Sequence, residues 1–313
     1  MGAASRRYRL HSSANRRSPG GNSAYRAAVV AHGGCIIRPA SHGLGCQQAD
    51  LSQNSFLLTK WYLDCVAESG DAVILYVADL QWNTLTLHYG SLIKVLDGKV
   101  ASATSLRGSP APRLDGKILS ANLPGLEVEG TWEALRPPIR RTVFQNLQGS
   151  VDWHCLQPMS QVELLLRGKI RVNGLGYAEC LTLNLLPWQL PLTSLNWGRY
   201  LSREDAIVWI DWQGREPKQA IVHNGEEHAA SSITESEIVF ADGRAQLQLD
   251  RGLVLRQGPL GDTVFPGVSR LAKLLPRSML SVQERKWRSR AEFRTPAGAS
   301  SGWAIHEVVK WKE

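Results

Sequence analysis

Paired cysteines, long apolar runs and helical periodicity are all scarce in this chain of 313 residues. Its five cysteines are an odd number without CxxC spacing, which indicates neither a disulfide framework nor a zinc knuckle. We interpret them as free thiols that fill the core of a protein kept in a reducing compartment. No stretch approaches the ~18 apolar residues of a membrane span, and the apolar run at 27–31 is too short for a secretory signal. We therefore expect a soluble, cytoplasmic protein, with peripheral membrane contact left open.

Acidic residues are missing from the first 49 positions, which carry seven arginines. Seven of the eight net positive charges reside there, since the rest of the chain has 29 Lys and Arg against 28 Asp and Glu. Nucleic-acid binding needs a basic stripe on the folded surface, so we predict no nucleic-acid partner. We interpret residues 1–50 as a disordered basic leader, although a transit peptide or a mis-assigned start codon has the same composition.

Short runs in which apolar and polar residues alternate begin at Phe56 and are separated by Gly, Pro, Asn and Asp. Such runs are typical of β-sandwiches and barrels. We therefore predict an all-β fold with little helix, the one helical pattern being 268–275. The strands that we expect are 56–63, 72–79, 84–91, 126–132, 161–167, 177–184, 194–201, 207–212, 245–249, 282–293 and 303–311.

A pair of prolines, Pro137 and Pro138, marks the best internal boundary, because paired prolines do not fit a central strand. Both lie in the turn-rich stretch 136–150. We divide the folded part there and predict two β domains, residues 51–145 and 146–313.

The segment 174–212 places an aromatic ring beside an ionisable group on three successive predicted strands. Side chains two residues apart share one face of a strand. The pairs are Tyr177 with Glu179, Trp197 with Arg199, and Trp209 with Asp211. An ionisable group on an otherwise apolar face is unusual, so we expect all of these side chains to converge on one interior.

Two interpretations of this cluster are open. In the structural one, Arg199 forms a buried ion network with Glu179 or Asp211 that fixes the strand register. In the catalytic one, burial raises the pKa of a carboxyl group, which stays protonated and acts as a general acid. Protonation of an isolated carbon–carbon double bond gives a carbocation, and the faces of Trp and Tyr stabilise such a cation.

Glu307 is a second candidate acid. It is the only ionisable group on the strand face that it shares with Trp303, Ile305, Val309 and Trp311. The structural alternative is that Glu307 is the partner of an interior arginine or tryptophan.

The same segment resembles the core of carotenoid 1,2-hydratases, also called hydroxyneurosporene synthases, in three motifs. These are GYAE at 176–179, Pro-Trp at 187–188 and WGR at 197–199. The family has a GYHDHN-type segment before its WGR, whereas this chain has Ala-Glu-Cys at 178–180 and lacks the histidines. The resemblance implies two packed lipocalin-like (calycin) β barrels that hold a hydrophobic small molecule, namely an isoprenoid or another unsaturated lipophile.

Together these patterns predict a hydro-lyase or isomerase that hydrates, cyclises or isomerises an unsaturated isoprenoid with a carboxylic general acid. The predicted catalytic residues are Glu179, Asp211, Tyr177 and Glu307, and the predicted substrate-binding residues are Trp188, Trp197, Arg199 and Trp209. We expect no cofactor and no metal, because the sequence has neither a Gly-rich phosphate loop after a strand nor a metal-ligand set. A non-catalytic binding protein and a scaffold with a filled barrel are the alternatives.

We predict that deleting residues 1–50 leaves the melting temperature unchanged, because the strand pattern begins only at Phe56. Thermal unfolding of the truncated and full-length chains measures this directly. A drop of more than a few degrees, which is on the order of 1 kcal/mol for a domain of this size, would contradict the boundary.

Overall fold

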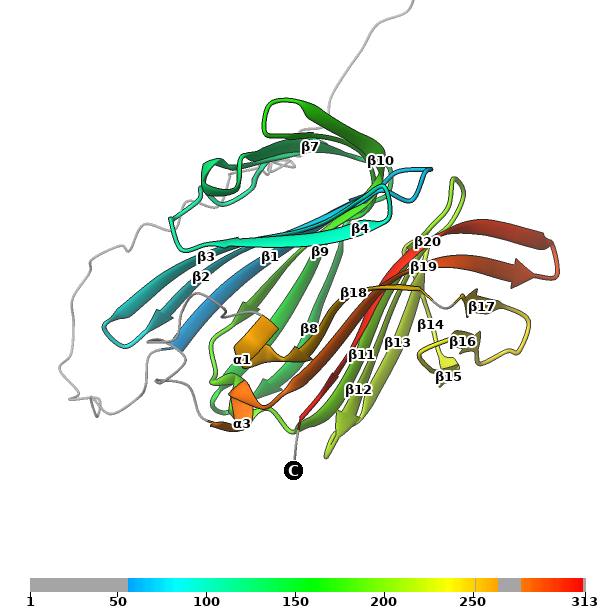
Figure 1. The fold of residues 1–313 in the computed structure, drawn as a ribbon. Helices are drawn as coiled ribbons and strands as arrows, with labels where there is room; N and C mark the ends of the chain where they lie inside the picture. The colour runs from blue at the N-terminus through cyan, green and yellow to red at the C-terminus, as the bar shows by residue number, and fades with distance from the viewer. Residues whose placement is uncertain (1–55, 251, 264–276, 312–313) are drawn as a thin grey trace, which may run out of the picture. The chain divides into compact units, whose positions relative to one another are not determined.

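The computed structural model describes residues 56–250, 252–263 and 277–311, which are mostly β-strand (Figure 1). The strands form two antiparallel sheets of ten strands each, so the predicted all-β fold is confirmed. The predicted leader at 1–50 and the predicted helix at 268–275 lie outside the described residues. No helix in the described part of the chain is long and apolar enough to cross a membrane.

The first sheet, sheet A, has the strand order β4-β3-β2-β1-β10-β9-β7-β6-β5, with β8 paired to β9. Its strands are β1 (Phe56–Val66), β2 (Ala72–Trp82), β3 (Leu85–Leu96), β4 (Lys99–Ser105), β5 (Arg113–Asp115), β6 (Ile118–Leu123), β7 (Val128–Ala134), β8 (Ile139–Asn146), β9 (Gly149–Leu166) and β10 (Ile170–Leu183). A 3₁₀ turn, η1 (Pro124–Leu126), joins β6 to β7.

The second sheet, sheet B, has the order β14-β13-β12-β11-β20-β19-β17-β16-β15, with β18 paired to β19. Its strands are β11 (Leu192–Leu201), β12 (Ala206–Gly214), β13 (Lys218–His223), β14 (Glu226–His228), β15 (Ala230–Ile233), β16 (Glu237–Phe240), β17 (Gln246–Leu249), β18 (Leu253–Pro259), β19 (Gln283–Thr295) and β20 (Gly298–Lys310). The short helical elements are η2 (Pro187–Gln189), α1 (Leu260–Thr263) and α3 (Arg277–Leu280).

The change from one sheet to the other comes between Leu183 and Leu192. Residue 145, where we divided the folded part, lies near the end of β8, and β9 and β10 of the same sheet follow it. The two prolines do lie outside the strands, in the segment 135–138 between β7 and β8. Because a sheet is not by itself a domain, the domain division stays a prediction.

Sheet A curls around an apolar interior of its own. Leu92 of β3 and Leu119 of β6 belong to one buried cluster, although many strands separate them in the sheet order. Strands so far apart can share a cluster only if the sheet is strongly curved, which Figure 1 shows. Sheet B has a separate interior that contains Trp209, Phe240 and Phe293.

A third apolar cluster joins the two sheets and is called the intersheet layer here. Its buried side chains include Tyr62, Ile74, Tyr76 and Tyr177 of sheet A together with Trp197, Val208 and Ile305 of sheet B. Successive side chains of a strand point to opposite faces of its sheet. In each sheet, one face therefore packs into that sheet's own interior and the other face packs into the intersheet layer.

Candidate functional site

The pairing of β1 with β10 places four polar side chains on one face of sheet A. Tyr62 lies opposite Glu179, and Asp64 lies opposite Tyr177. Cross-strand partners share a face. Since Tyr62 and Tyr177 belong to the intersheet layer, Asp64 and Glu179 also face sheet B.

The face of sheet B that belongs to the intersheet layer also carries charged side chains beside aromatic ones. Trp197 lies opposite Glu307 of β20, and Glu307 lies opposite Lys286 of β19. Arg199 follows Trp197 on the same face of β11 and lies opposite Ile305. Charged groups from both sheets therefore meet in the intersheet layer.

Arg199 pairs with Asp64 and not with Glu179 or Asp211, so our expectation for its partner is wrong. Its Nε donates to Asp64 Oδ2 at 2.9 Å and its Nη2 donates to Oδ1 at 2.7 Å. Both side chains are 0% exposed, and Tyr62 donates its hydroxyl to the same carboxylate at 2.9 Å. Burial alone lowers the pKa of Arg199, but the adjacent Asp64 carboxylate outweighs it and raises that pKa. Arg199 is thus a charged side chain that ties sheet B to sheet A.

Glu179 is held by neutral donors instead of a cation. Tyr177 donates its hydroxyl to Glu179 Oε2 at 2.6 Å, and Trp153 donates its indole N–H to the same oxygen at 2.5 Å. Burial raises the pKa of Glu179, and these two hydrogen bonds oppose but do not cancel the effect. Glu179 Oε1 accepts no hydrogen bond from the described residues, so a proton on this oxygen is not held by a neighbouring side chain.

Glu307 has the opposite environment, because it forms an ion pair with Lys286, which is 1% exposed. Burial raises the pKa of Glu307, but Lys286 overrides this effect and the pKa is lowered. Glu307 is therefore held as a carboxylate. Its contacts match the structural alternative, with a lysine as the partner in place of an arginine or tryptophan.

The ammonium group of Lys286 also occupies the aromatic faces of the intersheet layer. Its Nζ lies 5.4 Å from the ring centroid of Tyr62, 5.9 Å from that of Tyr76 and 5.4 Å from that of Trp197. These are cation–π distances. Trp197, one of the predicted substrate-binding residues, is thus already in contact with a cation of the protein itself.

Trp209 and Asp211 lie on the other face of sheet B, so the predicted convergence is wrong for these two residues. In the pairing of β11 with β12, Trp209 lies opposite Gly198 and Asp211 opposite Asn196, which alternate with Trp197. Trp209 is buried in the interior of sheet B and donates to Asn196 Oδ1 at 3.2 Å. The carboxylate of Asp211 accepts hydrogen bonds from two glutamine side chains at 2.6 and 2.9 Å.

Trp188 lies in η2 and packs edge-on against Trp82, with ring centroids 5.4 Å apart. It belongs to the cluster around Phe144 and Trp212, not to the intersheet layer. Five of the predicted site residues therefore lie together in the intersheet layer, namely Tyr177, Glu179, Trp197, Arg199 and Glu307. Trp188 lies apart from them.

Trp153 connects Glu179 to a cavity of about 180 Å³ between the sheets. The apolar part of its wall comes from Trp153 and Val143 of sheet A and from Val208, Ile210 and Val222 of sheet B. Ala220 and the polar or charged residues Arg141, Thr142, Lys218, Gln219 and Glu227 also line it. A small apolar group in this cavity could lie against Trp153, one of the two donors to Glu179.

Sequence reasoning missed Asp64, Trp153 and Lys286. Asp64 did carry a signal, since it is a lone acid in the apolar run 61–66, directly after the predicted strand 56–63. Trp153 was missed because the strand range predicted in this region, 161–167, covers only the last part of β9. In the described part of the chain, no group of three or more His, Cys, Asp or Glu is placed to hold a metal ion.

No protein-family model and no curated protein matches this sequence. The structure, however, is similar to solved structures over most of its length. It matches CghA with a TM-score of 0.52 and 11% identity, covering 82% of this chain and 89% of CghA. A structure of CghA with Sch210972 matches with a TM-score of 0.50 and 10% identity, over the same shares of the two chains. A Nitrosomonas europaea protein provisionally named AttH matches with a TM-score of 0.50 and 8% identity, covering 84% of this chain and 98% of that one.

At these identities the likeness shows the fold alone. The predicted lipocalin-like β-barrel fold is thereby confirmed. The catalytic and binding roles of the site residues stay predictions.

We predict that Asp64→Asn destabilises the fold by about 3–5 kcal/mol, because the Arg199 guanidinium then stays buried without its counterion. Urea unfolding of the purified variant measures the loss. Asp64→Leu combined with Arg199→Met should recover most of it, since both charges are removed together. Glu68→Gln breaks the exposed pair with Arg203 and should leave the midpoint unchanged. An Asp64→Asn variant as stable as the parent would show that the pair does not tie the sheets.

The raised pKa of Glu179 predicts how stability depends on pH. Below about pH 4.3, the ordinary glutamate value, both folded and unfolded chains are protonated at this site. As the pH rises from there to the folded pKa, the unfolded chain releases the proton first and the parent loses stability. The glutamine of Glu179→Gln does not titrate, so the variant does not lose stability in this way. The difference in unfolding free energy, variant minus parent, should therefore increase as the pH rises from about 4.3 to the folded pKa and should then level off. Urea unfolding from low to neutral pH tests this, and a constant difference would refute a raised pKa.

Proposed function

We propose that this chain binds an unsaturated lipophile between its two sheets and protonates a carbon–carbon double bond from Glu179. The observation that carries the proposal is the environment of this carboxyl group. It is buried, its pKa is raised, and its two hydrogen bonds both enter Oε2. These features favour a protonated Glu179 whose proton resides on Oε1.

Proton transfer would proceed from Glu179 Oε1 to one carbon of the double bond. The π electrons form the new C–H bond, the other carbon becomes a carbocation, and Glu179 becomes a carboxylate. Tyr177 and Trp153 already donate to Oε2, so the new negative charge is met by hydrogen bonds that exist before the reaction. Water then adds to the cation and returns a proton to Glu179, which gives a hydro-lyase, or an adjacent C–H loses its proton to Glu179, which gives an isomerase.

The cavity beside Trp153 limits what part of a ligand could react. A volume of about 150 Å³ accommodates benzene, so the cavity of about 180 Å³ would hold one five- or six-carbon unit. The end of an isoprenoid chain has this size. The rest of a longer ligand would have to extend toward the charged rim, where Arg141 pairs with Glu227 at 2.6 Å.

Two further points support a lipophile as the ligand. The motifs at 176–179 and 197–199 resemble those of carotenoid 1,2-hydratases, and they lie on β10 and β11, which contribute Tyr177, Glu179, Trp197 and Arg199 to the site. CghA, which shares the fold, is also known in a structure with the small molecule Sch210972. The choice of an isoprenoid rests on the resemblance alone.

A non-catalytic binding protein is the second candidate, and the position of Lys286 favours it. Its ammonium group covers Tyr62, Tyr76 and Trp197, so these rings cannot also cover a carbocation. In this case the cavity beside Trp153 would hold the ligand unchanged.

We predict that Glu179→Gln keeps the fold and the ligand affinity but abolishes turnover, because the amide is nearly isosteric with a protonated carboxyl and cannot donate an acid proton. Product formation from unsaturated isoprenoids, assayed beside thermal unfolding, measures both effects. Glu307→Gln is the matched control, and it should lower stability because it leaves Lys286 buried without its partner. Full turnover in a stable Glu179→Gln variant would remove Glu179 from the mechanism. Ligand binding by the parent without any product would establish the second candidate.

A further inference from the structure

A second cavity, of about 410 Å³, lies on sheet A away from the intersheet layer. Its walls are the β5–β6 turn, the segment between β7 and β8, and residues of β9. It shares no lining residue with the cavity beside Trp153. Its volume falls in the range of roughly 300–1,000 Å³ that is usual for small-molecule sites.

Three of the residues that line this cavity each have a buried polar atom without a hydrogen-bond partner among the described residues. The atoms are Nε of Arg136, Nε2 of His154 and Oε1 of Gln157. A buried polar atom left without a partner is costly, and native proteins rarely keep one without a reason. Three such atoms around one cavity indicate that something outside the chain satisfies them.

The orientation of the Gln157 amide is fixed by its other contacts. Its Nε2 donates to the carbonyl oxygens of Lys117 at 3.1 Å and Trp132 at 3.0 Å. Both partners are acceptors, so the amide nitrogen and not the oxygen must lie there. Gln157 is 0% exposed, and its Oε1 is thus a buried acceptor in need of a donor.

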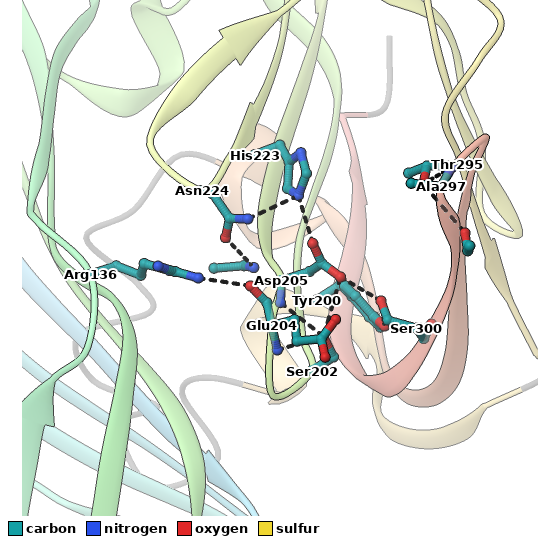
Figure 2. A network of polar contacts seen from close by, with 12 residues as sticks. Arg136, Tyr200, Ser202, Glu204, Asp205, His223, Asn224, Thr295, Ala297 and Ser300 are labelled. Carbon is teal, nitrogen blue, oxygen red and sulfur yellow. Dashed lines mark hydrogen bonds and ion pairs between the residues drawn. The ribbon is translucent and has the colours of Figure 1, made fainter.

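Arg136 is also held in place by a contact outside the cavity. Its Nη2 donates to the backbone carbonyl of Glu204 at 2.7 Å, next to the hydrogen-bonded group of Asp205 and His223 (Figure 2). One end of the guanidinium is therefore anchored on the loop between β11 and β12, while its buried Nε has no hydrogen-bond partner among the described residues.

The charges around the cavity are all of one sign. Lys117, Arg136 and Arg140 line it, and no acidic residue in the described part of the chain does. Burial lowers the pKa of His154, and the Arg140 guanidinium lowers it further, so the imidazole is neutral and adds no charge of its own. An anion would balance the three cations.

We propose that this cavity binds a small organic anion that carries a hydroxyl group. The acidic group lies against Arg136, Arg140 and Lys117, and the hydroxyl donates to Gln157 Oε1. Carboxylates and phosphate esters both offer this chemistry. The site is independent of the function proposed for Glu179.

Isothermal titration calorimetry of the full chain tests both parts of the proposal. The probes are malate and glycerol 3-phosphate, each compared with its analogue that lacks the hydroxyl group, succinate and propyl phosphate. At least one hydroxylated probe should bind, with its analogue about tenfold weaker or more, because the analogue leaves Gln157 Oε1 unpaired. The probe that binds identifies the anion as a carboxylate or a phosphate.

Paired variants show whether binding occurs in this cavity or on the arginines of residues 1–49. Lys117→Ala with Arg140→Ala removes two exposed cations of the cavity and should weaken binding by about tenfold. Lys99→Ala with Arg171→Ala removes two exposed cations elsewhere on sheet A and should leave affinity unchanged. The proposal is overturned if neither hydroxylated probe binds at millimolar concentration, if the analogues bind equally well, or if both variant pairs lose affinity alike. Ordered water would then be what satisfies the three atoms.

Discussion

The buried ion pair between Asp64 and Arg199 is the contact on which the arrangement of the candidate site depends. Burying two charges costs about as much as their attraction returns, so such a pair contributes little net stability. Its effect is on specificity, because any packing of the sheets that separates the partners leaves a charge unpaired in an apolar layer. The same carboxylate accepts the hydroxyl of Tyr62, which lies opposite Glu179 on the neighbouring strand. The ion pair thereby sets which side chains of sheet B meet Glu179.

Two carboxyl groups in one apolar layer have opposite protonation behaviour, and their neighbours explain why. Glu307 faces the ammonium group of Lys286, which favours its charged form. Glu179 accepts its hydrogen bonds from a neutral phenol and a neutral indole, and these bonds together with the Lys60 charge do not offset burial. Burial is common to both, so the choice of partner decides the direction of each pKa shift. This contrast, and not the presence of acids on apolar faces, is what distinguishes a candidate proton donor from a structural carboxylate.

The sequence predicted the strands more reliably than it predicted the site. Long strands such as β1, β2, β11, β12 and β20 were found because their apolar residues alternate strongly. Several strands were missed, among them β4, β5 and β8, most of whose residues are exposed and give only a weak alternation. The missed strand β6 does alternate between exposed and buried residues, but it is only six residues long. Alternation also gives the two faces of a strand without saying which cluster each face joins. Trp209 and Trp197 both stand beside an ionisable group in the sequence, yet the register of β11 with β12 sends them to different interiors.

The partner of Arg199 could not be found by local reasoning, since Asp64 lies 135 residues earlier in the chain and in the other sheet. Glu179 and Asp211, the partners predicted from the sequence, lie in the same segment as the WGR motif. Pairing of distant strands depends on the topology of the whole fold, and a single sequence does not reveal it. A lone acid in an apolar strand, as at Asp64, is a better guide to such a partner than nearness in sequence.

The position of Lys286 limits the chemistry that the intersheet layer can support. A carbocation formed against Tyr62, Tyr76 or Trp197 would have to displace an ammonium group that is also held by Glu307. The ion pair is neutral as a whole, so at a distance it neither attracts nor repels a cation strongly. Two rings that donate to Glu179, those of Tyr177 and Trp153, are not covered by Lys286, and of these Trp153 lines the cavity. Trp153 and Glu179 are adjacent on sheet A, but Glu179 is not among the residues that line the cavity, so an alkene held there would have to reach the acid past the ring of Trp153.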